Sequence, residues 1–283
     1  MALSFNCGFK VTGALHRPAV VLLHSSLSTG AQWQALTKQL DADFCCINID
    51  LLGYGDAPEV SDLVANAADY QLTTEVERVM AIIDSLIGDA SFSIVGHSYG
   101  GAVGLRLAHL VEKKAQKKMQ MQQASRLSSM VLYEPVAFHL LDPNHEIEGA
   151  AYREITQIAN PLVNLSPRIA AQSFIDYWNY DGFFATLPSK VQQLFSDKMA
   201  KVSLDFQALM GEPCTIDDYQ FNDCPVLVME GESSRLSAKI LAKRLATGLP
   251  NASHQVFAGG HMAPVADSVA VAEVIGGFLR GQV

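Results

Sequence analysis

Gly96-His97-Ser98-Tyr99-Gly100 follows an apolar run at residues 92–95 and precedes a segment of small, helix-compatible residues. A Gly-x-Ser-x-Gly motif between a strand and a helix forms a sharp turn that exposes the serine hydroxyl at the end of the strand. The two glycines are needed because larger side chains would collide in so tight a turn. The motif therefore predicts that Ser98 is a nucleophile.

A serine nucleophile needs a base, which must come from elsewhere in the chain. Of the eight histidines, His261 has the most suitable setting, because it lies in Gly259-Gly260-His261-Met262 between a strand-like segment at 254–257 and a helix-like segment at 266–279. Open parallel sheets place their sites in such loops, at the carboxyl ends of strands. We therefore predict that His261 removes the proton from Ser98.

With these two residues in place, the chain resembles the α/β-hydrolase family over nearly all of its length. The family's oxyanion segment, His-Gly-x after a strand, corresponds to His24-Ser25-Ser26, and its Asp-x-x-Gly-x-Gly-x-Ser signature corresponds to residues 50–57. Two positions depart from the pattern, since Ser25 replaces the usual glycine and Ala57 replaces the usual serine. The first change affects the turn that is expected to face the nucleophile.

The resemblance also implies which groups surround the nucleophile. The backbone N–H groups of Ser26 and Tyr99 are expected to form the oxyanion hole, which binds the negative oxygen that develops during acyl transfer. His24 and His97 are expected to orient residues beside the site. We assign five residues to the substrate pocket: Ser25, His24, His97, Trp178 and Met262.

The acid that would complete a catalytic triad is less clear. Family members usually carry an aspartate after the strand that corresponds here to residues 226–229, but this chain has Ser234 in that place, and a serine cannot hold a negative charge against an imidazolium. Some members carry the acid one strand earlier, where this chain has Glu134. Glu134 is therefore our first choice and Glu232 our second, and a dyad of serine and histidine without an acid remains a third possibility.

Short apolar segments alternate with helical patterns along most of the chain, which predicts parallel strands joined by crossover helices. The expected strands are residues 19–24, 45–50, 92–96, 130–133 and 226–229. We predict an α/β-hydrolase fold, with a mostly parallel central sheet and helices on both faces. Residues 1–137 and 219–283 would form the core, and 138–218 a helical cap inserted before the strand at 226–229.

Three helical segments carry more specific predictions. A capping box, Thr74-x-x-Glu77, is expected to start a helix whose apolar stripe faces the sheet. The helix after Ser98 is expected to continue through the lysine-rich residues 112–123, either as a solvated end or as a small basic docking patch. In the cap, the aromatic stretch 174–184 either packs the cap helices together or forms an apolar acyl pocket.

Composition excludes several classes of function. The 283 residues carry a formal net charge of −9, with a sequence pI near 5.3, which argues against a nucleic-acid partner. Neither of the glycine-rich nucleotide-binding motifs is present, the five cysteines show no ligand spacing, and no apolar stretch is long enough for a membrane span. We therefore expect no cofactor, no metal and a cytoplasmic location.

These observations predict a cofactor-independent serine hydrolase that acts on a small carboxylic ester through an acyl-enzyme on Ser98. Cleavage of a carbon–carbon bond or of an amide would use the same machinery. A non-catalytic ligand sensor on the same fold is the alternative from a different class, because Ser25 and Ser234 depart from the catalytic pattern. The oligomeric state is left open.

Overall fold

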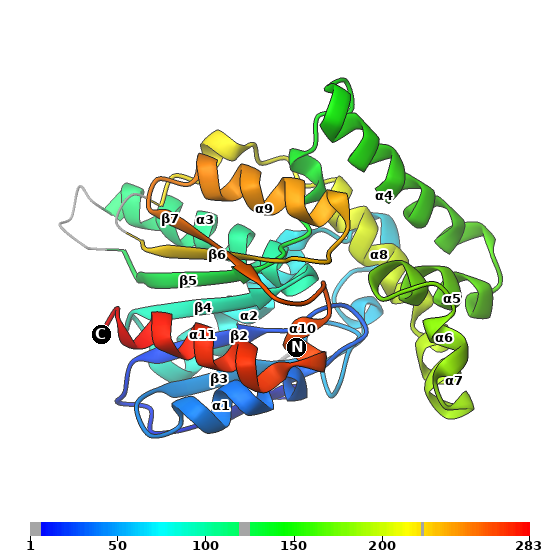
Figure 1. The fold of residues 1–283 in the computed structure, drawn as a ribbon. Helices are drawn as coiled ribbons and strands as arrows, with labels where there is room; N and C mark the ends of the chain where they lie inside the picture. The colour runs from blue at the N-terminus through cyan, green and yellow to red at the C-terminus, as the bar shows by residue number, and fades with distance from the viewer. Residues whose placement is uncertain (1–6, 119–124, 222–223) are drawn as a thin grey trace.

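The computed structural model describes residues 7–118, 125–221 and 224–283, and these ranges build a central sheet with helices on both faces (Figure 1). The seven-stranded sheet has the order β1-β3-β2-β4-β5-β6-β7. The strands are β1 (Phe9–Thr12), β2 (Ala19–Leu23), β3 (Cys45–Ile49), β4 (Phe92–His97), β5 (Leu127–Tyr133), β6 (Val226–Gly231) and β7 (Ala252–Phe257). This architecture is the predicted α/β-hydrolase fold.

The strands in the middle of the sheet are continuous apolar runs because helices cover both of their faces. Every residue of β2, β3 and β4 is buried, and these strands pair in parallel. Cys45 packs into the core on one face of the sheet and Cys46 into the core on the other, as expected for successive residues of a strand. The edge strand β1 pairs antiparallel with β3 and was not predicted from the sequence.

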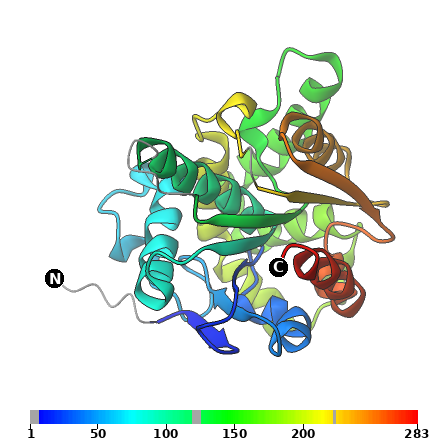
Figure 2. The ribbon, with the colours of Figure 1, turned by 90° about the vertical axis from the view of Figure 1, so that its left-hand side faces the viewer.

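Helices lie on each face of the sheet, as Figure 2 shows from the side. One face is covered by α1 (Gln34–Leu40) and α11 (Ser268–Arg280). The other is covered by α2 (Leu72–Ile87), α3 (Tyr99–Lys118) and α9 (Leu236–Gly248). No helix within the described ranges has the length and apolar character needed to cross a bilayer.

The start of α2 differs from the prediction. The helix begins at Leu72, and its capping box pairs Gln71 with Thr74, so the predicted box of Thr74 with Glu77 is wrong. The start lies earlier because Leu72 is itself fully buried, and Gln71 supplies the capping side chain. The predicted apolar stripe is confirmed, since Val76, Val79, Met80 and Ile83 are buried. Of the lysine-rich segment, residues 119–123 lie outside the described residues.

The chain between β5 and β6 forms a group of helices to one side of the sheet, which we refer to as the cap (Figure 1). Its helices are α4 (Glu146–Asn164), α5 (Pro167–Trp178), α6 (Phe183–Thr186), α7 (Ser189–Asp197) and α8 (Met199–Met210). The cap adjoins the carboxyl ends of the strands, because Trp178 of α5 stacks on His261, in the loop after β7. The short α10 (Ala263–Ala266) follows that loop.

Candidate active site

The turn between β4 and α3 holds Ser98 in a strained conformation. Its φ of 54° lies in the left-handed region, which residues other than glycine rarely adopt. A Cβ atom at Gly96 would lie 2.6 Å from the carbonyl oxygen of Gly100, and one at Gly100 would lie 2.4 Å from the carbonyl oxygen of Leu23. Both glycines are therefore required sterically. The backbone N–H of Ser98 donates to the Tyr133 carbonyl oxygen at 3.1 Å, which ties the turn to the end of β5.

Three side chains that are distant in sequence form a continuous hydrogen-bonded relay. His261 Nε2 lies 3.0 Å from Ser98 Oγ, and His261 Nδ1 lies 2.7 Å from Glu134 Oε2. Glu134 is fully buried and His261 is only 4% exposed. A buried carboxylate on one side of an imidazole and a serine hydroxyl on the other can move a proton from the serine to the histidine.

The backbone holds Glu134 firmly in this position. Glu134 directly follows β5, has a φ of 41°, and donates its N–H to the Met229 carbonyl oxygen at 2.9 Å. Its second carboxylate oxygen, Oε1, accepts the N–H of Gly231 at 2.5 Å. One oxygen therefore binds the backbone of β6 while the other faces His261, so the carboxylate cannot rotate without losing a hydrogen bond.

The alternative acid, Glu232, lies at the surface. Its N–H donates to the Phe257 carbonyl oxygen, and its own carbonyl oxygen accepts from Lys239 Nζ at 2.5 Å. These contacts use the backbone of Glu232 and leave its side chain exposed to water. The structure thus brings Glu134, rather than Glu232, into contact with His261.

His97 and Tyr133 support the loop that carries His261. His97 Nε2–H donates to the His261 carbonyl oxygen at 2.8 Å, and the Tyr133 hydroxyl donates to the Gly260 carbonyl oxygen at 2.9 Å. Burial lowers the pKa of His97 well below its ordinary value, so the ring stays neutral. These two bonds fix the backbone from which the His261 imidazole extends.

His24 performs the same task for the oxyanion segment. Its Nδ1–H donates to the Ser25 carbonyl oxygen at 2.7 Å, and its Nε2 accepts the Leu51 N–H at 2.9 Å. The assignment of His24 and His97 to the substrate pocket is wrong, because both are fully buried, bind backbone groups and do not line the cavity that contains Ser98. Their expected orienting role agrees with these contacts.

We expect His24 to make the protein sensitive to acid. Burial lowers the pKa of His24 from 6.5 to about 4, so the unfolded chain takes up this proton first as the pH falls. The contribution of His24 to the free energy of unfolding should therefore be fully present above pH 6.5. It should decrease toward pH 4, by about 1.4 kcal/mol per pH unit for this one residue. Urea unfolding at several pH values should show a smaller decrease in a His24→Gln variant. Equal decreases in the two proteins would contradict the expectation.

Ser26 and Tyr99, the residues expected to form the oxyanion hole, come from two different segments, the loop after β2 and the start of α3. Tyr99 is the first residue of α3, and the first N–H groups of a helix have no partner within the helix. The partial positive charge of this helix end also favours a negative oxygen. Ser26 lines the cavity in front of Ser98, while the N–H and hydroxyl of Ser25 both donate to Gln32 Oε1, at 3.2 and 2.9 Å. The side chain at Ser25, where the family pattern has glycine, is thus held by Gln32, which is half-buried.

A cavity of about 370 Å³ lies directly in front of Ser98 and His261. Ser25, Trp178 and Met262, three of the residues assigned to the pocket from the sequence, line it. The cap contributes six further apolar residues to the wall: Phe174, Ile175, Phe183, Leu187, Val191 and Phe195. The aromatic stretch of the sequence therefore contributes to the pocket as well as to cap packing.

Trp178 stacks on the imidazole of His261, with ring centroids 3.9 Å apart and an interplanar angle of 28°. No pattern in the sequence indicated this contact. The Tyr177 ring packs edge-on against Trp178 at 4.7 Å, which fixes the indole over the imidazole. The indole therefore covers one face of the imidazole.

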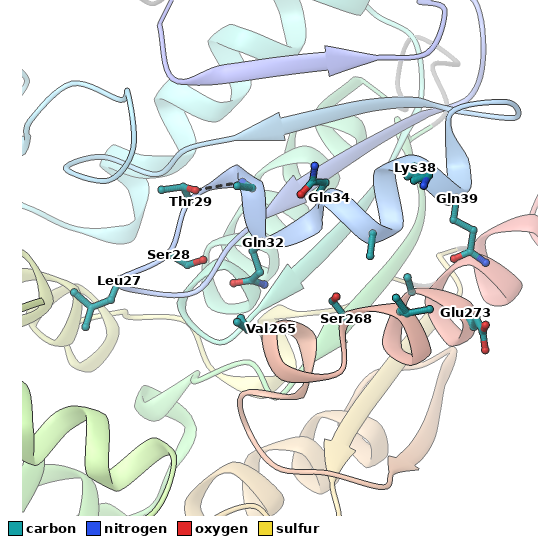
Figure 3. A pocket seen from close by; sticks show the side chains of 14 residues that line it. Leu27, Ser28, Thr29, Gln32, Gln34, Lys38, Gln39, Val265, Ser268 and Glu273 are labelled. Carbon is teal, nitrogen blue, oxygen red and sulfur yellow. Dashed lines mark hydrogen bonds between the residues drawn. The ribbon is translucent and has the colours of Figure 1, made fainter. Parts of the chain in front are cut away.

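A larger and more open groove adjoins the cavity (Figure 3). It has a volume of about 1010 Å³ and runs between α1 and α11, past Gln32, Lys38 and Glu273. Leu27, Ser28 and Val265 line both this groove and the cavity at Ser98. These three residues therefore form a wall that the groove and the cavity share.

The fold and the site together define a class of protein: a hydrolase of the α/β type, with a serine at the turn after β4 and a histidine after β7. The sequence profile of the alpha/beta hydrolase family matches residues 20–274, and the chain belongs to this family. The match covers the elbow, the relay and the whole cap.

Individual relatives share only part of their length and about a third or less of the aligned residues with this chain. The human "Serine hydrolase-like protein" is 33% identical over 95 residues, which are 34% of this chain and 44% of that protein. Lipase LipV of Mycobacterium tuberculosis is 30% identical over 147 residues, or 51% of this chain and 45% of the lipase. The chain thus spans less than half the length of these curated relatives. A thermophilic esterase from Thermogutta terrifontis shares the fold, with a TM-score of 0.71, 20% identity, and coverage of 97% of this chain and 93% of the esterase.

Proposed function

We propose that the protein is a cofactor-independent serine hydrolase that cleaves small carboxylic esters through an acyl-enzyme on Ser98. The observation that carries this proposal is the buried relay, in which His261 contacts Ser98 Oγ at 3.0 Å and Glu134 at 2.7 Å. Membership of the alpha/beta hydrolase family supports a hydrolytic reaction. A protein that only bound ligands would have no need for a carboxylate buried behind the histidine.

In the proposed reaction, Ser98 Oγ attacks the ester carbonyl carbon while His261 Nε2 takes the hydroxyl proton. The N–H groups of Ser26 and Tyr99 bind the resulting oxyanion. When the tetrahedral intermediate collapses, the carbon–oxygen bond to the alcohol breaks and His261 returns the proton to the leaving alcohol. Water then attacks the acyl-enzyme with His261 as base, which releases the carboxylic acid and restores Ser98.

The two neighbours of His261 have complementary roles. Glu134 accepts Nδ1–H, which leaves Nε2 free to accept the proton of Ser98 and stabilises the imidazolium by its charge. Trp178 covers one face of the ring and excludes water from it. The small volume and apolar wall of the cavity favour a short, uncharged acyl group.

Active-site labelling tests the proposal. The folded protein would be incubated with a fluorophosphonate, which reacts with activated serine nucleophiles, and the modified peptide identified by mass spectrometry. We expect one adduct, on Ser98, and none in a Ser98→Ala variant. A folded protein that is not labelled, and that does not hydrolyse short nitrophenyl esters, would favour the ligand sensor.

Trp178→Ala is expected to change substrate preference. Removing the indole enlarges the cavity and uncovers His261, so KM for nitrophenyl butyrate should rise and longer acyl chains should be accepted, with a decrease in kcat of about 10-fold or less. Trp178→Phe, which keeps an aromatic ring over the imidazole, should retain more activity. Kinetics measured at equal concentrations of folded protein provide the check. A lower melting temperature with unchanged KM and chain-length preference would restrict Trp178 to packing.

A further inference from the structure

A cluster of buried charges lies beneath the oxyanion segment, outside the relay. Lys201 and Asp205 on α8 of the cap are 5% and 1% exposed, and Glu75 on α2 is fully buried. Lys201 Nζ donates to Asp205 Oδ1 and lies 3.4 Å from Glu75 Oε1 and 3.0 Å from the Tyr70 hydroxyl. An ammonium group on the cap is thus paired with one carboxylate from the cap and one from the core.

Aromatic rings enclose the same ammonium group. Lys201 Nζ lies 4.7, 5.0 and 4.9 Å from the ring centroids of Tyr54, Tyr70 and Tyr99. The stem of Lys201 passes Gly53, where a Cβ atom would lie 3.1 Å from it and the φ is 73°. The glycine of the family signature at 50–57 therefore provides space for a cap residue to enter the core.

Both residues of the proposed oxyanion hole are tied to this cluster by their side chains. Asp205 Oδ2 accepts from Ser26 Oγ at 2.7 Å and from the Tyr54 hydroxyl at 2.5 Å. The Tyr99 hydroxyl lies 2.8 Å from the Tyr70 hydroxyl and 3.3 Å from Glu75 Oε1. Burial raises the pKa of Tyr99 well above its ordinary value, so this phenol remains protonated and able to donate.

A buried charge cluster is a costly way to obtain stability, because apolar packing of the same volume is usually at least as stabilising. The cluster instead fixes the orientation of its side chains, since each carboxylate oxygen accepts hydrogen bonds from defined donors. Glu75 Oε2, for example, accepts the Leu52 N–H at 3.1 Å. The hydrogen bonds of the cluster connect α8 of the cap to α2, to the start of α3 and to the segments that follow β2 and β3.

We infer that Asp205 and Lys201 are positioning residues through which the cap sets the geometry of the oxyanion hole. Asp205 holds the hydroxyl of Ser26, and Lys201 balances the charge of Asp205 and Glu75 beneath the ring of Tyr99. The N–H groups of Ser26 and Tyr99 are thereby kept at the spacing that the tetrahedral oxyanion requires. This inference rests on the proposed function.

The experiment compares two conservative variants with a matched control. Ser26→Ala removes the hydroxyl that binds Asp205 and keeps the backbone N–H, while Asp205→Asn keeps the shape of the side chain and removes its charge. The control is Glu212→Gln, which breaks another buried ion pair near the cap, 3.1 Å from Arg106 on α3 and away from the oxyanion segment. Each variant removes a single hydroxyl or a single charge, but only Ser26→Ala and Asp205→Asn change the contact between Ser26 and Asp205.

We expect Ser26→Ala and Asp205→Asn to lower kcat by about 10- to 100-fold with KM changed by less than about 2-fold, since the lost interaction acts in the transition state. Affinity for a trifluoromethyl ketone, which forms a tetrahedral adduct with serine, should fall by a similar factor, while affinity for the carboxylic acid product should not change. The double variant should be no worse than the poorer single variant. Glu212→Gln should lower the melting temperature and leave kcat unchanged.

The possible failures can be told apart. If Ser26→Ala and Asp205→Asn lose stability as Glu212→Gln does, but keep kcat and ketone affinity, the cluster only anchors the cap and the inference is overturned. If Asp205→Asn does not fold, Ser26→Ala alone decides, because it removes a single hydroxyl. A wild-type protein with neither ester turnover nor fluorophosphonate labelling would overturn the proposed function, and this inference with it.

Discussion

Ser98→Ala should lower kcat for nitrophenyl butyrate by about five or six orders of magnitude while the protein remains folded. The Ser98 hydroxyl is the proposed attacking atom, and it is the hydroxyl that lies 3.0 Å from His261 Nε2. Serine and alanine are equally strained by the left-handed φ of 54° at this position, so the substitution adds no new backbone strain. Steady-state kinetics measure the loss, and a melting temperature near that of the wild type establishes that the fold persists.

His261→Ala should have nearly the same effect, because nucleophile and base act as a unit and the loss of either removes the same step. The double variant should therefore be little worse than either single variant. Retention of most of the activity by Ser98→Ala would exclude Ser98 from the mechanism. A mild effect of His261→Ala alone would mean that another base serves Ser98.

Glu134→Gln should lower kcat by about two to four orders of magnitude. The carboxylate accepts two N–H groups at once, from His261 Nδ1 through Oε2 and from Gly231 through Oε1. A glutamine can accept only one of them, since its NH₂ group would face the other donor. The variant therefore loses the negative charge and either misorients His261 or strains the end of β6.

Glu232→Gln is the matched control for this prediction, because it makes the same chemical change on an exposed side chain directly after β6. Its kcat should equal that of the wild type. Normal activity of Glu134→Gln together with a large loss in Glu232→Gln would reverse the assignment of the acid. If neither change affects kcat, the protein works with a serine–histidine dyad or is not an esterase.

The sequence predicted the parts of the fold that depend on local patterns. Buried parallel strands are apolar throughout, so β2, β3 and β4 were located to within a residue or two. The strand β1 has only four residues, none of them fully buried, and such a short mixed segment cannot be distinguished from a loop. The start of α2 was misplaced by three residues, almost one helical turn, because Thr74 with Glu77 and Gln71 with Thr74 are both plausible caps in sequence.

For the site, the sequence determined the elbow at Ser98 and the loop of His261, because both follow from strand ends and from glycines that a tight turn requires sterically. Only the tertiary structure decided which glutamate meets His261, since that contact joins residues 127 positions apart. It also decided that His24 and His97 bind backbone groups and do not line the pocket, that Trp178 covers the histidine, and that Asp205 reaches Ser26 across 179 positions. The contacts of Trp178 and Asp205 depend on how the cap lies over the core, and those of Glu134, His24 and His97 depend on how the loops after the strands come together. No local periodicity or turn motif encodes either arrangement.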